Sequence, residues 1–483
     1  MKKETSPIKF GTDGWRSLVA EDFTFPNVRL VAQSIAQYLK SHPAEGRPLK
    51  VIVGYDTRPL GDRFAEAVAE VLAGNGFEVL LTNGPMPTPA ISFSIREFKL
   101  CGGIAVTASH NPFTYNGIKF KPYYAGPSEP EMTRWVEEHL GTEPLKQVAI
   151  ADGLSTGKIK TIDLAPKYLS FVRGYVDWPL VKRAKFKVAY DNMHGAGQTL
   201  LQRLLEGSGI RVIPANDDPW PVHANHRPEP VGEHLKGLGA VVRKSGCHAG
   251  LATDGDADRL GLVGPDGKFV SSQETMALLL WHLLEDRKWR GLVVTTVSGT
   301  KLVDSMTAHY KVPLKRTPVG FKHIAAYMRI EDVLFGGEES GGFGFRGCVP
   351  ERDGLLAGLL VLEMMAMRRQ PLSTILREMR RRFGTWIFER ADLVLSRPVS
   401  SEELKEWAAK NAGNGLTLAP GVKVKEIRTE DGVKVILDDE SWLLLRPSGT
   451  EPLLRIYSEG KSQTQVKNLI ESGKRIGLQI IGK

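Results

Sequence analysis

A serine and a histidine, Ser109 and His110, stand in the loop that follows an apolar run. The run Ile104–Val106 indicates a buried strand, and the polar stretch Thr107–Pro112 comes directly after it. Open α/β sheets place their reactive groups in the loops that leave the carboxyl ends of such strands. Ser, Asn and Pro are also ordinary turn residues, so this stretch alone is compatible with a plain polar turn. The alternative is that Ser109 is a nucleophile.

Three aspartates at alternate positions follow a second apolar run. Asp254, Asp256 and Asp258 come after Gly250–Ala252. In an extended chain, residues two apart share a face, so the three carboxylates are expected to converge. Because three like charges repel, they need a counter-ion, and hard oxygen ligands suit Mg²⁺. A calcium loop of the EF-hand type is excluded, since Arg259 stands where that loop needs glycine. A solvated acidic turn is the remaining alternative.

A glycine-rich loop follows a third apolar run, at Gly336–Gly342. Glycines let the backbone approach a ligand closely, and Glu338 and Ser340 could hydrogen-bond to sugar hydroxyls. Taken alone, the loop is equally compatible with a flexible turn.

The fourth candidate loop, near the C-terminus, could hold an anion. Arg446, Ser448, Gly449 and Thr450 follow the apolar run Trp442–Leu445. A guanidinium, two hydroxyls and backbone N–H groups around a glycine form a cradle for phosphate oxygens. A β-turn with a surface arginine is the structural alternative. Two further cations could serve a site or lie at the surface: Arg16 stands beside small residues near the N-terminus, and Lys322 precedes a short helix.

The elements that must position these loops repeat along the chain. A short β run, a polar loop and an amphipathic helix recur in three blocks, which indicates stacked β-α-β units. After Thr385 the pattern changes to β runs joined by the turn Glu430–Gly432 and closed by a helix. The chain is therefore predicted to be α/β, with three similar α/β domains followed by an α+β domain. The expected domains are residues 1–155, 156–265, 266–378 and 379–483.

Composition is that of an ordinary globular protein, with 42% hydrophobic and 25% charged residues. The net charge of +9 suits phosphorylated substrates or a nucleic acid. However, the basic run Arg377–Arg382 is interpreted as a solvated helix face, and no nucleic-acid motif accompanies it. The run Leu355–Met367 contains Glu363 and is too short to span a bilayer. With no secretory signal visible and three scattered cysteines, we expect a cytoplasmic protein without membrane or nucleic-acid partners.

Together these motifs resemble one family, the α-D-phosphohexomutases, in family order and over essentially the whole chain. The motifs are the loop Gly11–Arg16, Thr107–Pro112, Asp254–Arg259, Gly337–Gly341 and Arg446–Thr450. The resemblance implies four domains around a central cleft, each contributing one loop. It also implies that these enzymes act on small sugar phosphates, as monomers or homodimers.

The resemblance further implies roles for individual residues. Ser109 would be carried as a phosphoserine, and Asp254, Asp256 and Asp258 would hold Mg²⁺ with a phosphoserine oxygen as a further ligand. The phosphoryl group would pass to the sugar to give a hexose 1,6-bisphosphate, such as glucose 1,6-bisphosphate, which reorients and returns the other phosphate. The remaining roles are also assigned by resemblance. The acid/base candidates are His110 and Lys119, and Arg259 and Arg16 would steady the phosphoryl group. Sugar hydroxyls would be bound by Glu338 and Ser340, and the distal phosphate by Arg446, Ser448, Gly449 and Thr450.

Two expectations follow from details of these loops. Lys119 would need a lowered pKa to act as a base, which nearby cations and burial could give. Gly342 stands where many phosphomannomutase/phosphoglucomutase and phosphoglucosamine mutase members carry histidine, and with Lys322 this form looks more like the phosphoglucomutases. Glucose is therefore expected over mannose. A phosphomannomutase, a dual enzyme, a phosphoglucosamine mutase and a Mg²⁺-dependent phosphatase remain as alternatives.

Overall fold

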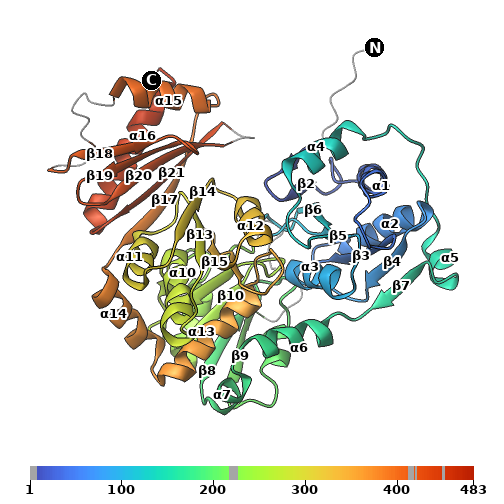
Figure 1. Cartoon of the computed structure of the whole chain (residues 1–483), viewed down its shortest axis with the longest axis horizontal. Helices are drawn as coiled ribbons and strands as arrows, with labels where there is room; N and C mark the ends of the chain where they lie inside the picture. Colours follow the sequence, from blue (N-terminus) through green and yellow to red (C-terminus); the bar gives the residue numbers. More distant parts are fainter. Residues whose placement is uncertain (1–7, 217–226, 412–417, 419–420, 449–451, 483) are drawn as a thin grey trace.

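The computed structural model describes residues 8–216, 227–411, 418, 421–448 and 452–482. The chain passes through four domains in order, each packed on the next, and the first and fourth lie at the two ends of an arc (Figure 1). Three domains are built on mixed sheets with helices, and the fourth on an antiparallel sheet. The predicted sequence of three α/β domains and one α+β domain is confirmed.

The first domain contains a seven-stranded sheet in the order β1-β2-β6-β5-β3-β4-β7. Its strands are β1 (Phe10–Gly11), β2 (Gly14–Leu18), β3 (Lys50–Tyr55), β4 (Glu78–Thr82), β5 (Gly102–Val106), β6 (Tyr115–Pro122) and β7 (Ile159–Ile162). Its helices are α1 (Phe25–Ser41), α2 (Gly61–Gly74), α3 (Thr88–Glu97), α4 (Pro130–Glu138) and α5 (Ile150–Ser155). The boundary expected after residue 155 lies just before β7, which pairs with β4 and so still belongs to this sheet.

Alternation along β3 explains how both faces of this sheet are covered. Val51 and Val53 belong to one core with residues of α1 and α2, whereas Ile52 belongs to another with Ile91 and Ile95 of α3. Successive side chains of a strand point to opposite faces, so a continuous apolar run needs helices on both sides. This layering leaves the loops at the carboxyl ends of β3 and β5 side by side, because the two strands are parallel neighbours.

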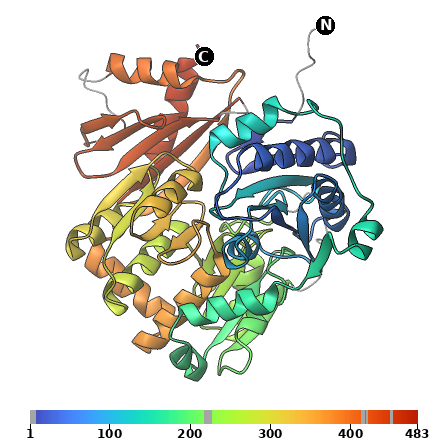
Figure 2. The same ribbon diagram turned by 45° about the vertical axis from the view of Figure 1, so that its right-hand side comes forward.

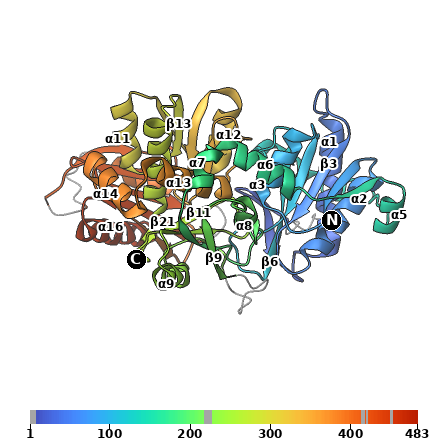
Figure 3. The ribbon, with the colours of Figure 1, turned by 90° about the horizontal axis from the view of Figure 1, so that it is seen from below.

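The second domain carries a five-stranded sheet in the order β12-β11-β10-β8-β9. Its elements are α6 (Ala165–Tyr175), α7 (Trp178–Arg183), β8 (Lys187–Asp191), α8 (Leu200–Leu204), β9 (Arg211–Asn216), α9 (Lys236–Ser245), β10 (Ala249–Thr253), β11 (Leu260–Val263) and β12 (Phe269–Val270). Seen from below, this green domain lies between the first and third domains (Figure 3). The aspartate loop connects β10 to the antiparallel β11 and therefore points away from the body of the sheet.

The third domain has the sheet order β14-β13-β15-β16. Its elements are α10 (Ser272–Trp281), a π-helical turn (His282–Asp286), β13 (Leu292–Thr296), α11 (Lys301–Tyr310), β14 (Leu314–Thr317), α12 (Phe321–Ile330), β15 (Val333–Gly337), β16 (Phe343–Phe345), α13 (Gly354–Arg368) and α14 (Leu372–Phe383). The apolar run noted in the sequence forms α13, whose residues Gly354–Ala366 are buried. In the described part of the chain, no helix combines the length and apolarity that crossing a membrane requires.

The fourth domain is an antiparallel sheet in the order β17-β21-β20-β19-β18. Its elements are β17 (Ile387–Val394), α15 (Ser401–Asn411), β18 (Val424–Arg428), β19 (Val433–Leu437), β20 (Trp442–Pro447), β21 (Leu453–Gly460) and α16 (Gln463–Ile480). After the molecule is turned by 45°, this red domain is seen above the third domain and beside the first (Figure 2).

Candidate active site

The Ser109 loop begins where β5 ends and is held in a strained conformation. Ser109 is fully buried and has a φ of 52°, a left-handed backbone that non-glycine residues rarely adopt. Its N–H donates to Thr107 Oγ1 at 2.9 Å, and its hydroxyl donates to Asp254 Oδ2 at 2.9 Å. His110 Nδ1 lies 3.5 Å from the same hydroxyl. The strain and the contact across two domains aim the serine oxygen at the aspartate loop.

A buried arginine that the sequence analysis did not single out fixes this loop. Arg58 follows β3, and its Nε donates to Asp56 Oδ2 at 3.1 Å. Its Nη1 donates to the carbonyls of Pro112 and Tyr115, and its Nη2 to those of Ser109 and Asn111, at 2.6–2.9 Å. All five guanidinium donors therefore have a partner. The sequence places Arg58 only in the segment after β3, and the adjacency of β3 and β5 that brings it to the Ser109 loop is seen only in the fold.

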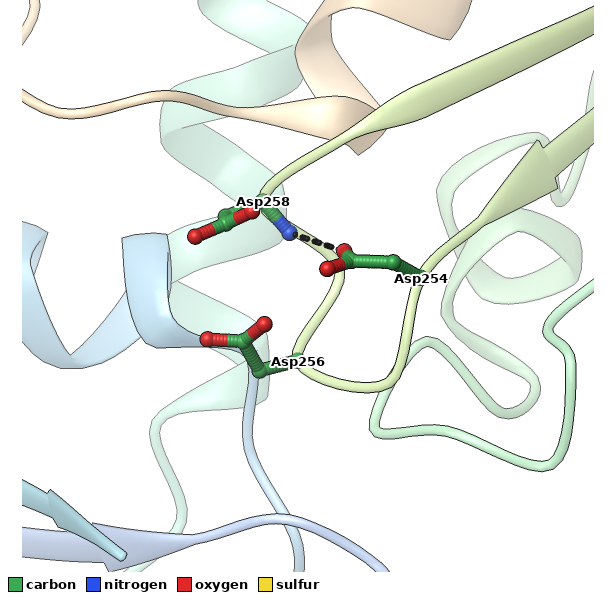
Figure 4. A group of neighbouring side chains, drawn as sticks. All are labelled: Asp254, Asp256 and Asp258. Atoms are coloured by element: carbon green, nitrogen blue, oxygen red, sulfur yellow. Dashed lines mark hydrogen bonds between the residues drawn. The ribbon is translucent and has the colours of Figure 1, made fainter. Parts of the chain in front are cut away.

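The three aspartates converge as expected, but not for the predicted reason. One oxygen from each of Asp254, Asp256 and Asp258 lies within 4.8 Å of the others (Figure 4). They do not lie on an extended strand, because the chain turns sharply at Ala257, whose φ is 55°. Asp254 Oδ1 closes the turn by accepting the N–H groups of Asp258 and Arg259, at 2.9 and 3.1 Å. A turn stabilised by its own first carboxylate brings the three side chains together.

The carboxylate group fits a hard divalent cation. All three side chains are buried, and Oδ1 of Asp256 and of Asp258 makes no hydrogen bond with the described residues. Burial, and then repulsion by Asp258 and Asp256, raises the pKa of Asp254 well above its ordinary value. Buried carboxylate oxygens without donors are costly unless a cation pairs with them. Oxygen ligands of this kind are those that Mg²⁺ prefers.

Lys119, on β6, contacts the aspartates, and its protonation state differs from the one that a base would need. Its Nζ lies 2.9 Å from Asp13, 2.7 Å from Asp256 and 3.1 Å from Asp258. Burial lowers its pKa, but the attraction of these three carboxylates is larger in sum, so the pKa is raised above its ordinary value. The expected lowering of the Lys119 pKa is therefore wrong for this arrangement, in which the amine is a charged ammonium.

A second buried arginine, Arg352, joins three domains and was also missed in the sequence. Its Nη2 donates to Asp258 at 2.6 Å and to Asp13 at 3.0 Å, and its Nη1 donates to Glu338 at 3.3 Å. Glu338, at the end of β15, is itself buried. Burial raises the pKa of Glu338 to about 7 against the opposing attraction of Arg352. The Arg352 guanidinium therefore links the predicted sugar loop to the aspartate loop through hydrogen bonds.

The position of the Arg352 side chain requires a glycine at position 342. A Cβ atom at Gly342 would lie 2.2 Å from Cδ of Arg352 and 2.9 Å from its Cγ. The space beside the sugar loop that a side chain at position 342 would take is filled by Arg352. Because three carboxylates hold the end of that arginine, its stem has little freedom to move aside.

The other predicted residues of the first three domains lie around this centre. Arg16 donates from Nη1 to Asn111 Oδ1 at 3.0 Å, and Arg259 Nε lies 3.8 Å from Asp258. Burial, and then the charges of Arg259 and Arg16, holds the pKa of the partly exposed His110 well below its ordinary value. Ser340 is partly exposed on the sugar loop. Lys322 lines a cavity of about 230 Å³ with Gly11–Gly14.

The predicted phosphate cradle lies in the fourth domain and makes its own contacts. Arg446 Nε donates to both carboxylate oxygens of Asp431 at 2.9 Å. Ser448 is partly exposed, and its N–H donates to the carbonyl of Leu453 at 2.8 Å. Gly449 and Thr450 lie outside the described residues. The structure thus brings Ser109, the aspartates, Lys119 and Glu338 together, while Arg446 is paired within its own domain.

Comparison with known proteins agrees with this architecture. Four family models match in order: phosphoglucomutase/phosphomannomutase alpha/beta/alpha domain I at residues 7–147, domain II at 166–267, domain III at 271–383 and the C-terminal domain at 399–472. A phosphoglucomutase/phosphomannomutase of Thermococcus kodakarensis is 32% identical, with 97% of this chain and 98% of that protein covered. A phosphoglucosamine/phosphogalactosamine mutase of Sulfurisphaera tokodaii is 30% identical, with 97% and 98% covered. A crystal structure from Thermus thermophilus, of a protein with a provisional phosphomannomutase name, is 33% identical, with 98% and 99% covered and a TM-score of 0.83.

The fold and the assembled loops define an enzyme that moves phosphoryl groups on sugars. On the strength of these matches, the chain belongs to the phosphoglucomutase/phosphomannomutase family, the α-D-phosphohexomutases. It is a phosphohexomutase, and its relatives carry the names of more than one hexose.

Proposed function

We propose that this enzyme interconverts α-D-glucose 1-phosphate and glucose 6-phosphate through a phosphorylated Ser109 and a glucose 1,6-bisphosphate intermediate. The observation that carries the proposal is the buried Ser109 hydroxyl, 2.9 Å from Asp254 in a group of three carboxylates that fits a divalent cation. A serine in this position can pass a phosphoryl group to a sugar oxygen. The bond from phosphorus to Ser109 Oγ breaks, and a bond from phosphorus to the sugar oxygen forms.

Asp254, Asp256 and Asp258, with an oxygen of phosphorylated Ser109, would hold Mg²⁺. The bound ion would neutralise charge on the phosphoryl oxygens, which makes phosphorus more open to attack. Lys119 and Arg259 add positive charge on the same side, because both lie within ion-pair distance of the aspartates. Phosphoryl transfer depends mainly on such positioning and charge, so this cluster is where we place the reaction.

The sugar hydroxyl must lose its proton during transfer, and we assign that proton to His110. Its pKa is held low, so its imidazole is neutral and can accept a proton, and it lies next to the Ser109 oxygen. Lys119 is paired with three carboxylates and stays an ammonium, which suits it to charge stabilisation. Arg16 would steady the phosphoryl group through the same loop, since it binds Asn111.

The sugar loop supports a neutral hexose. Glu338 and Ser340 would bind sugar hydroxyls, and Arg352 fixes the Glu338 carboxylate from one side. Glucose is preferred over glucosamine in this proposal because the loop carries Gly342 and not the histidine found in many phosphoglucosamine mutases. Arg446, Ser448, Gly449 and Thr450 would bind the phosphate that is not reacting, with Lys322 facing the same substrate from the third domain. A mannose-accepting or dual enzyme is the alternative, because the two hexoses differ at one carbon.

The test is mutase turnover on the 1-phosphates of glucose, mannose and glucosamine in parallel, with Mg²⁺ and catalytic glucose 1,6-bisphosphate. We expect glucose 1-phosphate to be the best substrate and glucosamine 1-phosphate the poorest. Equal rates on glucose and mannose would establish a dual enzyme, and a preference for glucosamine would overturn the glucose assignment.

Ser109→Ala should abolish turnover, whereas Ser94→Ala, which removes a buried hydroxyl bonded to the Ala90 carbonyl within α3, should not. Release of phosphate without isomerised sugar would instead indicate a phosphatase.

A further inference from the structure

Asp431 is an acidic residue that the proposed chemistry does not use, yet it touches the phosphate-binding arginine and a neighbouring domain. It lies in the turn between β18 and β19, and it accepts two hydrogen bonds from Arg446 Nε at 2.9 Å. Its Oδ2 also accepts the backbone N–H of Val319, in the third domain, at 2.7 Å. Both side chains of the ion pair are largely buried, with exposures of 21% and 17%. A pair shielded in this way is screened little by solvent, so it can fix geometry.

The turn cannot easily drift away from the arginine that it holds. Gly432 has a φ of 82°, and a Cβ there would lie 2.2 Å from the carbonyl oxygen of Leu445 and 3.1 Å from Cα of Arg446. Val433 then pairs with Leu445 in the sheet. The turn therefore packs directly on the backbone that carries Arg446.

The contact with Val319 also connects Asp431 to the third domain, in the segment that precedes Lys322. Val319 leads into Gly320, which caps α12, and Lys322 is the second residue of that helix. Lys322 lines the cavity next to the Gly11–Gly14 loop of the first domain. One carboxylate thus holds Arg446 from the fourth domain and the segment that presents Lys322 from the third.

We infer that Asp431 is a positioning residue for substrate phosphate: it orients Arg446 and locks that orientation to the docking of the fourth domain on the Val319–Lys322 segment. Only the Nε edge of Arg446 is used in this contact, and the two Nη groups are the pair with which a guanidinium grips phosphate. Without Asp431, Arg446 keeps its charge but loses the fixed direction of that pair. The inference rests on the proposed function, since it assumes that Arg446 binds the phosphate that is not reacting.

The experiment is a double-mutant cycle in which binding and turnover are both measured. The variants are Asp431→Asn, Arg446→Gln and the two together, with Glu430→Gln as the matched control. Glu430 is the neighbouring carboxylate and lines the same side of the domain junction. Binding of glucose 1,6-bisphosphate is measured by calorimetry in a Ser109→Ala background, where no turnover interferes. Steady-state kinetics give KM and kcat for glucose 1-phosphate, and hydrolysis of phosphorylated Ser109 by water is followed without sugar.

We expect Asp431→Asn to weaken bisphosphate binding and raise KM about tenfold, as loss of one charge-assisted contact would do. Hydrolysis of phosphorylated Ser109 by water should be unchanged, because it needs no distal phosphate. The double variant should bind no more weakly than Arg446→Gln alone, since Asp431 acts through that arginine. Glu430→Gln should match the parent.

Independent, multiplying effects of the two substitutions would overturn the inference, as would an Asp431→Asn variant with the affinity of the control. If Asp431→Asn does not fold, Asp431→Glu is used in its place. This variant keeps the charge but moves it one methylene further out, so bisphosphate binding should be partly lost. Unchanged affinity in Asp431→Glu would contradict the inference. Failure of the proposed function is distinct, because the parent enzyme would then bind no bisphosphate and isomerise no hexose phosphate.

Discussion

Replacing Arg58 with lysine should loosen the Ser109 loop, because no other side chain in that position can satisfy the same acceptors. The guanidinium donates five hydrogen bonds, one to Asp56 and four to backbone carbonyls of residues 109–115. An ammonium has three donors, so at least two acceptors lose their partner. At about 1.5–3 kcal/mol for each of two bonds to a charged donor, the free energy of unfolding should fall by about 3–6 kcal/mol.

The same substitution should slow phosphorylation of Ser109. Misplacing a reacting atom by about 1 Å can cost about 10²-fold in rate, and the Ser109 carbonyl is one of the groups that Arg58 holds. Hydrogen–deuterium exchange of the peptide over residues 106–118 measures the loosening, and mass spectrometry measures phosphate transfer from glucose 1,6-bisphosphate. Arg63→Lys is the control, because Arg63 is exposed and pairs with Glu66 on the same helix. Exchange and transfer rates in Arg58→Lys that match those of the control would show that Arg58 does not hold the Ser109 loop.

Three further predictions concern the centre of the site. Burial raises the pKa of Glu338 from 4.5 to about 7. Between those pH values the Glu338 carboxyl is ionised in the unfolded chain but still protonated in the folded one, so the free energy of unfolding should fall by about 3 kcal/mol as the pH rises. The fall should be absent in Glu338→Gln. Urea unfolding at pH 5 and pH 8 measures it, and the same pH dependence in both proteins would contradict the prediction. The raised pKa of Asp254 means that Mg²⁺ binding should release a proton, because the bound cation favours the charged carboxylate; calorimetry in two buffers of different ionisation enthalpy should detect the release, and equal heats in both buffers would contradict it. Gly342→Ala should lower the free energy of unfolding by about 1–3 kcal/mol, because the added Cβ would displace Arg352. Gly237→Ala is the control, since a Cβ at position 237 has no atom within 4 Å and should not destabilise the protein. Equal unfolding midpoints for the two variants would contradict the prediction.

The sequence indicates clearly where the functional loops lie, but it indicates poorly which side chains fix those loops in place. Ser109 and Asp254 follow buried strands, and strand alternation with helices was enough to place them at the ends of sheets. Arg58 and Arg352 could not be recognised in the same way, because a charged residue in a loop usually faces solvent. Only the folded arrangement shows that their acceptors come from a loop 53 residues away in one case and from three domains in the other.

The state of a side chain is harder to predict than its place. A base role for Lys119 would need a pKa lowered by nearby cations and partial burial, both of which favour the neutral amine. The structure places three carboxylates within 3.1 Å, and their attraction reverses the sign. Convergence of the three aspartates was predicted from alternation along a strand, whereas a turn at Ala257 produces it. In both cases the outcome depends on contacts between segments that sequence spacing does not reveal.

The phosphorylation state of Ser109 during turnover tests the proposed mechanism at its centre. The parent enzyme is mixed with glucose 1,6-bisphosphate carrying labelled phosphate, quenched, digested and examined by mass spectrometry, before and after a chase with unlabelled glucose 1-phosphate. If Ser109 carries the phosphoryl group, labelled phosphate will be found on the peptide that contains Ser109, and it will be lost to sugar bisphosphate at a rate no slower than turnover. Isomerisation that proceeds while Ser109 stays unphosphorylated would contradict the proposed mechanism.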